Sequence, residues 1–237
     1  MKKTIISCVL FLTAVTAFSQ TTMKTAAEAK LSASDLAVKI ADRILATTTY
    51  EFKNTKTGKT YKSVKDLPLD MNVKVACKYN NWHYTNGVTH IALMELADKT
   101  GAKKYDDYVL KNMNFVFNEG NLDFFKKQYD QAMKDEGWYG VRKLSWHMIF
   151  RGKRLDDNGP MGASLIDLQM KHPNNSFLNY INETAEHLNY GEPRLADGTI
   201  ARIWPHENTI WADDAFMAIS FLARMAKMTG DMNYIND

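Results

Sequence analysis

The sequence has few cysteines, little excess charge and, after its first twenty residues, no long apolar segment. Only two cysteines occur in 237 residues, and Cys8 lies so early that it would be removed with a signal peptide. Cys77 would then have no intramolecular partner, which excludes a disulfide framework. No later segment approaches the roughly 20 apolar residues of a membrane-spanning helix. Histidine and cysteine spacings also give no metal-binding motif, and we expect no cofactor.

Residues 1–19 have the features of a secretory signal peptide. Lys2 and Lys3 precede an apolar run, and Ala17 and Ser19 occupy positions typical of a cleavage site. Removal of this segment takes away two lysines and no acid, so the formal net charge falls from +3 to +1. A field this weak does not favour nucleic acid or an anionic membrane as a partner. We expect a periplasmic or secreted protein with residues 20–32 as a loose leader.

The rest of the chain is predicted to be mostly helical. Several segments repeat apolar residues three and four positions apart, which is typical of helices that bury one face. They are 36–45, 86–100, 105–117, 161–170, 177–188 and 215–228, with a weaker case at 122–133. The segment 51–70 is rich in lysine and threonine and ends at Leu67-Pro68. It predicts a long loop or small hairpin outside the core.

Two distant segments repeat one helical hairpin. Residues 93–101 and 222–230 both end in Thr-Gly, and Tyr105 and Tyr234 then open the next helix. Gly101 is expected to end its helix with a positive φ. Repeated hairpins bury their faces against neighbouring hairpins, as in solenoids and closed helical toroids.

A closed ring of such hairpins needs more of them than this sequence contains. We therefore expect the chain to be the N-terminal part of a ring. Its last long helix would then lack an outer partner and leave apolar side chains at least partly exposed. These side chains are Phe216, Ile219, Phe221, Leu222 and Met225.

Three polar clusters lie at the starts of predicted helices, at 80–87, 154–163 and 205–217. Each has a structural explanation when taken alone. The acids at 156–157 can form an Asx turn before a helix, and either acid at 213–214 can cap one. Tryptophans such as Trp82 are also more often core residues than sugar platforms. Together, however, two carboxylate pairs beside aromatic and imidazole groups are typical of a pocket in which one acid donates a proton to a sugar.

In this order, the three clusters resemble the unsaturated glycuronyl hydrolases of glycoside hydrolase families 88 and 105. Family 105 consists mostly of unsaturated rhamnogalacturonyl hydrolases. The likeness covers roughly residue 33 to the end. It rests on Asn81-Trp82-x-Tyr84-x-Asn86-Gly87, Leu155-Asp156-Asp157-x-Gly159-x-Met161-Gly162 and Trp211-x-Asp213-Asp214-x-Phe216-Met217. The resemblance implies an all-α, (α/α)6 barrel-like toroid, of which residues 33–237 would form about the first half.

The resemblance also implies a reaction. Members of these families remove a 4,5-unsaturated uronic acid from the non-reducing end of oligosaccharides that lyases generate, and unsaturated rhamnogalacturonan is the favoured substrate here. Such a sugar is a vinyl ether. An acid protonates C4, water adds at C5, and the unstable hemiketal opens and releases the remaining sugar. One well-placed carboxylic acid is the essential group.

The family's acid/base aspartate falls in Trp211-Ala212-Asp213-Asp214. Asp213 is preferred, and Asp214 is the alternative because alignment through the later Thr-Gly shifts the register by one. Burial beside Trp211 and a second carboxylate would raise the pKa of the donor. The second family aspartate falls at Asp156 or Asp157, of which Asp157 is preferred.

Other side chains are candidates for binding the sugar. Arg202 and His206 could meet its carboxylate, although Arg202 could equally be a solvated loop charge. The remaining candidates for stacking or hydrogen bonding are Trp82, His83, Tyr84, Asn86 and Trp211.

Two other classes of function remain open. The chain could be a non-catalytic fragment or a glycan-binding remnant of such an enzyme. It could also belong to another (α/α)-toroid glycosidase or a sugar epimerase. Conventional inverting hydrolysis would need a base across the pocket from the acid, and Glu207 is the obvious spare carboxylate.

Overall fold

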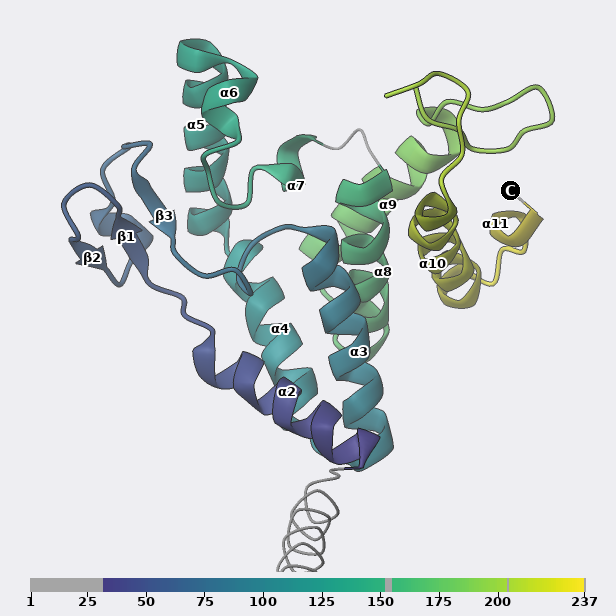
Figure 1. Cartoon of the computed structure of the whole chain (residues 1–237), viewed down its shortest axis with the longest axis horizontal. Helices are drawn as coiled ribbons and strands as arrows, with labels where there is room; N and C mark the ends of the chain where they lie inside the picture. The colour runs from purple at the N-terminus through teal and green to yellow at the C-terminus, as the bar shows by residue number, and fades with distance from the viewer. Residues whose placement is uncertain (1–31, 152–154, 204, 237) are drawn as a thin grey trace, which may run out of the picture. The chain divides into compact units, whose positions relative to one another are not determined.

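The computed structural model describes residues 32–151, 155–203 and 205–236 (Figure 1). The predicted signal peptide and residues 20–31 of the predicted leader lie outside the described residues. The chain divides into two compact units, residues 1–43 and 44–237, so each is described by itself. Helix α2 (Ala33–Thr47) begins in the first unit and ends in the second. No helix in the described ranges is long and apolar enough to cross a membrane.

The second unit is mostly helical, as predicted. All seven segments with helical periodicity are confirmed, including the weaker one, while the four-residue helices α6 and α7 are too short to leave a periodic pattern. The helices after α2 are α3 (Tyr84–Thr100), α4 (Lys104–Val116), α5 (Glu119–Glu136), α6 (Trp138–Val141), α7 (Met148–Arg151), α8 (Leu155–Lys171), α9 (Asn175–Tyr190), α10 (Ala212–Thr229) and α11 (Asn233–Asn236).

The repeated Thr-Gly signal ends two helices in the same way. Gly101 and Gly230 have φ values of 70° and 77°, in the left-handed region that glycine adopts without a steric penalty. Each donates its backbone N–H to a carbonyl four residues earlier, at 2.8 Å. The predicted C-cap at Gly101 is therefore confirmed, and Gly230 matches it.

A small antiparallel sheet lies between α2 and α3 in the chain. It has the order β2-β1-β3, formed by β1 (Phe52–Asn54), β2 (Thr60–Tyr61) and β3 (Val73–Val75). Phe52 pairs with Val75 across the sheet and is 1% exposed. Its ring packs against Phe115, Phe124 and Phe125. The prediction that this segment lies outside the core is wrong for Phe52, because a local polar composition concealed one aromatic anchor.

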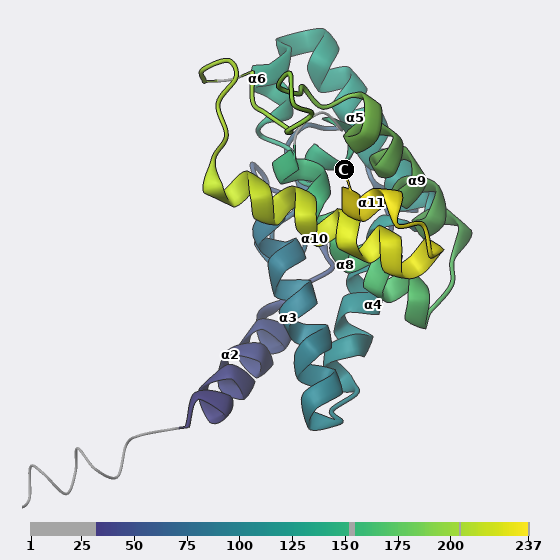
Figure 2. The same ribbon diagram turned by 90° about the vertical axis from the view of Figure 1, so that its right-hand side faces the viewer.

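Helix α8 is the central element of the second unit. It packs against α3, α9 and α10, and Figures 1 and 2 show it between α3 and α10. A Cβ atom at Gly87 of α3 would collide with the backbone of Pro160, and one at Gly159 would collide with the backbone of Met217 in α10. Gly87 and Gly159 therefore allow the backbone of α8 to pack directly against the backbones of α3 and α10.

One face of α10 packs on α8 and the other is exposed. Phe216 and Ile219 are exposed, as predicted, whereas Phe221, Leu222 and Met225 are buried. The prediction is wrong for these three because they lie on the inner face of the helix. A Cβ atom at Gly162 of α8, for example, would meet the ring of Phe221 at 2.8 Å.

Candidate active site

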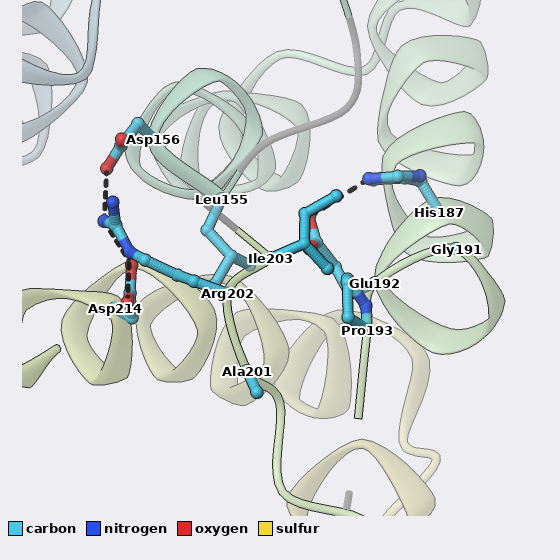
Figure 3. A pocket seen from close by; sticks show the side chains of 10 residues that line it. All are labelled: Leu155, Asp156, His187, Gly191, Glu192, Pro193, Ala201, Arg202, Ile203 and Asp214. Carbon is cyan, nitrogen blue, oxygen red and sulfur yellow. Dashed lines mark hydrogen bonds and ion pairs between the residues drawn. The ribbon is translucent and has the colours of Figure 1, made fainter. Parts of the chain in front are cut away.

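A cavity of about 480 Å³ lies where the first turns of α8 and α10 meet the end of α9 and the loop that follows it (Figure 3). Its ionisable lining residues are Asp156, His187, Glu192, Arg202 and Asp214. Figure 3 shows Arg202 between the two aspartates, with Glu192 and His187 on the other side of the cavity. Among the described lining residues, acidic groups therefore outnumber the single guanidinium.

Arg202 and Asp214 form the tightest contact in this cavity. The Nε and Nη2 atoms of Arg202 each donate to a carboxylate oxygen of Asp214 at 2.6 Å. Two parallel charge-assisted bonds of this kind fix both orientation and distance. The hydrogen bonding of the Arg202 guanidinium to Asp214 is the main reason that the pKa of Arg202 is raised. Arg202 is thus a pocket residue and not a solvated loop charge.

Trp211 joins this pair to the start of α10. Its backbone N–H donates to Asp214 Oδ2 at 3.2 Å, and the Arg202 guanidinium carbon lies 4.2 Å from the centre of its ring. Trp211 is the N-cap residue, and Asp214 is the third residue of the helix. The expectation that an aspartate occupies the cap position is therefore wrong, although Asp214 does satisfy the free N–H there.

Asp213 points away from this pair. Its side chain is exposed, and no hydrogen bond or ion pair joins it to another residue of the described ranges. Its charge still contributes to the raised pKa of Arg202, so the two groups are within electrostatic reach. Adjacent helical residues point about 100° apart. Asp213 is therefore exposed because Asp214 is buried, and the expected burial of Asp213 beside Trp211 is wrong.

The other aspartate pair is divided in the same way. Helix α8 begins at Leu155, so both acids lie in its first turn and not in an Asx turn before it. Asp156 lines the cavity, with Oδ1 3.7 Å from Nη2 of Arg202. Asp157 is buried and forms a bidentate ion pair with Arg151 of α7.

The model of Glycosyl Hydrolase Family 88 matches residues 53–237. The chain belongs to glycosyl hydrolase family 88. This confirms the family resemblance of the three sequence clusters. A comparison with curated proteins found no match.

A solved structure shares the fold of this family 88 chain. It is described as a possible member of the GH105 family from Klebsiella pneumoniae, with 13% sequence identity and a TM-score of 0.50. The match covers 87% of this chain and 46% of the crystal chain. The family 88 chain thus spans less than half the length of that neighbour. At this identity the likeness shows the fold alone, and it confirms the mostly helical, toroid-like class.

Two buried residues of the first polar cluster of the family 88 chain, Trp82 and Asn86, bind backbone oxygens and do not line the cavity. Trp82 is 2% exposed, packs at 4.8 Å against the ring of Tyr180, and donates through Nε1 to the backbone oxygen of Asp157 at 2.8 Å. Asn86 donates to the backbone oxygens of Lys78 and Asn81. Trp82 and Asn86 were candidates for binding the sugar, but Trp82 supports the start of α8 and Asn86 fixes the loop before α3.

Three other candidates lie outside the cavity lining. His83 is the N-cap of α3, where its Nδ1 accepts from the N–H of Thr85 at 3.3 Å. Its ring lies 4.6 Å from that of Tyr84, which is exposed. His206 is exposed in the loop before α10. The structure therefore brings together Asp156, Arg202, Trp211 and Asp214 but not these three.

His187 and Glu192 line the cavity and were missed in the sequence. Nε2 of His187 lies 3.1 Å from Oε1 of Glu192. Burial is the main cause of the raised pKa of Glu192, and the charge of Asp214 adds to it, while His187 lowers it. The only local signal was a histidine in the last turn of a helix before a glycine. Nothing in the sequence showed that this turn meets α10.

No group of three or more histidine, cysteine or acidic side chains in the described ranges is arranged to hold a metal ion. The chemistry available to the residues at hand is proton transfer, hydrogen bonding and contact with an aromatic ring. Carboxylates at helix starts beside a guanidinium and a half-exposed indole suit a polar, ring-shaped ligand.

Proposed function

We propose that this chain forms the acid-bearing side of an active site that removes a 4,5-unsaturated uronic acid from the non-reducing end of lyase-generated oligosaccharides. Unsaturated rhamnogalacturonan oligosaccharides are the proposed substrate, and the periplasm or the cell exterior is the proposed location. The observation that carries the proposal is the pocket at the starts of α8 and α10, where one aspartate from each pair of a family 88 chain, Asp156 and Asp214, meets Arg202.

The proposed reaction needs one proton donor and one water. The donor transfers a proton to C4, water adds its oxygen to C5, and the donor regains a proton from that water. The product is a hemiketal, which opens and breaks the bond to the remaining sugar. A positioned side chain that transfers a proton in this way typically contributes about 10²–10⁴-fold to the rate.

Asp213 is the proposed proton donor. Asp214 and Asp157 each form two hydrogen bonds with one arginine, so both of their carboxylate oxygens are already engaged in an anchoring contact. Asp213 has no such partner in the described ranges and lies beside Trp211. Asp156 reaches Arg202 only at 3.7 Å and is proposed as the second acid of the pocket.

Arg202 and Trp211 are proposed to form one wall of the sugar site. Trp211 is 43% exposed, so part of its ring is available to a ligand while Arg202 occupies the rest. Aromatic rings offer a sugar a flat apolar surface with little loss of side-chain entropy. Glu207, the spare base of a conventional inverting mechanism, is exposed and does not line the cavity.

The proposal is tested with an unsaturated disaccharide and its saturated counterpart. The purified protein should bind the unsaturated sugar, and turnover should remove the ultraviolet absorbance of its double bond. Cleavage of the saturated sugar alone would exclude the vinyl-ether mechanism. Binding without turnover in the parent protein would identify a glycan-binding remnant, so binding and turnover are measured separately.

A further inference from the structure

The cavity contains a second hydrogen-bonded pair that the proposed reaction does not use. Glu192 is 7% exposed, and His187 beside it is 21% exposed, measured on their side chains. The 3.1 Å contact uses Oε1 of Glu192 and Nε2 of His187. The pair lies in the cavity lining, across from Arg202 (Figure 3).

The end of α9 holds this pair in place. The backbone N–H groups of Gly191 and Glu192 both donate to the carbonyl of His187, at 2.7 and 3.0 Å. The chain therefore folds back over the last helical turn and brings Glu192 onto the imidazole. A Cβ atom at Gly191 would collide with the His187 ring. Only glycine fits this turn without displacing the ring, so the pair is preorganised.

The groups that face the pair are mostly acidic. Asp156 from α8 and Asp214 from α10 line the same cavity, and Asp213 lies within electrostatic reach of Arg202. Arg202 is already bound by Asp214. Arg194, which lies in the loop after α9, lowers the pKa of Glu192, but burial and Asp214 act in the opposite direction.

An anionic sugar therefore meets a cavity in which, among the described residues, carboxylates outnumber free cationic groups. Asp156 and Asp214 already neutralise much of the positive charge of Arg202, so Arg202 attracts the anionic sugar only weakly. A buried carboxyl that keeps a proton can supply a further donor, because an O–H···O⁻ bond to a charged acceptor is short and strong. Two lining carboxyls, Asp156 and Glu192, are not held by an arginine in a bidentate pair, and Glu192 is the more buried, with 7% of its side chain exposed against 32% for Asp156.

We propose that Glu192, held by His187, is a substrate-binding residue that takes up one proton and donates a hydrogen bond to the carboxylate of the bound uronide. The proton comes from solvent as the anion enters, and no covalent bond is made or broken. This inference rests on the proposed function only for the anionic nature of the sugar.

Proton uptake makes the affinity depend on pH. The bound anion favours the protonated form, so the pKa of Glu192 is higher in the complex than in the free protein. Affinity is then full below the pKa of the free protein. It falls about tenfold for each pH unit above that value, until the pKa of the complex is reached.

The test measures dissociation constants by calorimetry between pH 4 and 8. The probes are the unsaturated disaccharide acid and its neutral methyl ester, both bound to an Asp213→Asn background that prevents turnover. The acid should bind more weakly as pH rises and should take up one proton per ligand at intermediate pH. The ester should bind equally well throughout.

Three variants sharpen the result. Glu192→Gln keeps a donor but cannot titrate, so binding of the acid should become independent of pH. His187→Gln should move the fall in affinity to higher pH, because His187 lowers the pKa of Glu192. Glu207→Gln removes the same charge from the exposed loop and should behave like the parent.

Two outcomes would overturn the inference. If the acid binds independently of pH in the parent, or if Glu192→Gln keeps the parent's slope, Glu192 has no such role, although the proposed function stands. If neither sugar binds at any pH to protein with a cooperative thermal melt, the proposed function and the inference fail together.

Discussion

The two aspartate doublets, Asp156-Asp157 in α8 and Asp213-Asp214 in α10, have the same internal arrangement in different surroundings. In each doublet, the second aspartate is buried and accepts hydrogen bonds from Nε and Nη2 of one arginine. The first aspartate of each doublet is more exposed to solvent. The doublets differ in their arginines, since Arg151 comes from α7 and Arg202 from the loop before α10. A doublet at a helix start can thus combine one acid that anchors the helix with a neighbour that is more open to solvent.

The most direct test of this comparison is to neutralise Asp213 and Asp214 one at a time. Asp213→Asn removes the proposed donor without disturbing an ion pair, so turnover should fall about 10²–10⁴-fold with an unchanged thermal melt. Asp66→Asn, at an exposed position in the sheet region, is the control. If Asp213→Asn remains active while a folded Asp214→Asn is inactive, the assignment is wrong by one residue.

The next largest effect should come from the arginines. Arg151→Met takes a bidentate partner from the buried Asp157, and loss of one member of a buried pair costs about 3–5 kcal/mol in the free energy of unfolding. Arg202→Met should cost less, because the pocket admits water to Asp214. Urea unfolding measures both. Lys143→Met breaks an exposed pair with Glu136 and should leave the stability nearly unchanged. If Arg151→Met and Arg202→Met lowered the free energy of unfolding equally, the distinction between a buried anchoring pair and a pair open to the pocket would be wrong.

A smaller effect on stability is expected from the close contact of α8 with α10, which fixes the distance between the two doublets. Gly159→Ala forces a methyl group against the backbone of Met217, and overpacking of this kind typically costs about 1–3 kcal/mol. In Gly120→Ala the new methyl group meets only side-chain atoms among the described residues, Cγ1 of Val64 at 3.0 Å and Oδ1 of Asn118 at 3.6 Å, so this exposed helical position serves as a control. A stable Gly159→Ala protein with unchanged sugar binding would show that α8 and α10 can separate without harm.

The smallest expected effect is on the pH dependence of stability. The pKa of Glu192 is raised above 4.5 in the folded protein. Its proton therefore stabilises the fold fully below pH 4.5, and this contribution is lost as pH rises through the folded pKa. Relative to Glu192→Gln, the parent should become less stable between pH 4.5 and 7 in urea titrations. A constant difference across that range would contradict the raised pKa.

Local signals in the sequence predicted most of the helices but little of the pocket. The Thr-Gly ends were readable because a glycine C-cap depends only on its own turn. The surroundings of Asp156 and Asp157 were not, because the exact start of α8 decides which of them meets Arg202. Phe52 was missed because its partners lie on helices some sixty to seventy residues away.

The same limit applies to the pocket residues. Arg202 was named, but its pairing with Asp214 depends on how the loop returns to α10. His187 and Glu192 were not named, because only the packing of α9 near α10 gives their contact a function. Contacts between distant segments leave no periodic trace in one sequence.

The hydrogen bond from the Trp211 N–H to Asp214 makes the start of α10 sensitive to what happens in the cavity. Asp214 holds both that N–H and the Arg202 guanidinium, so a ligand that draws Arg202 away leaves the carboxylate free to shift. The first turn of the helix would then loosen or tighten with occupancy. The rate of amide hydrogen exchange at Trp211 would then change when a ligand binds in the cavity, even if no bond of the sugar is cleaved.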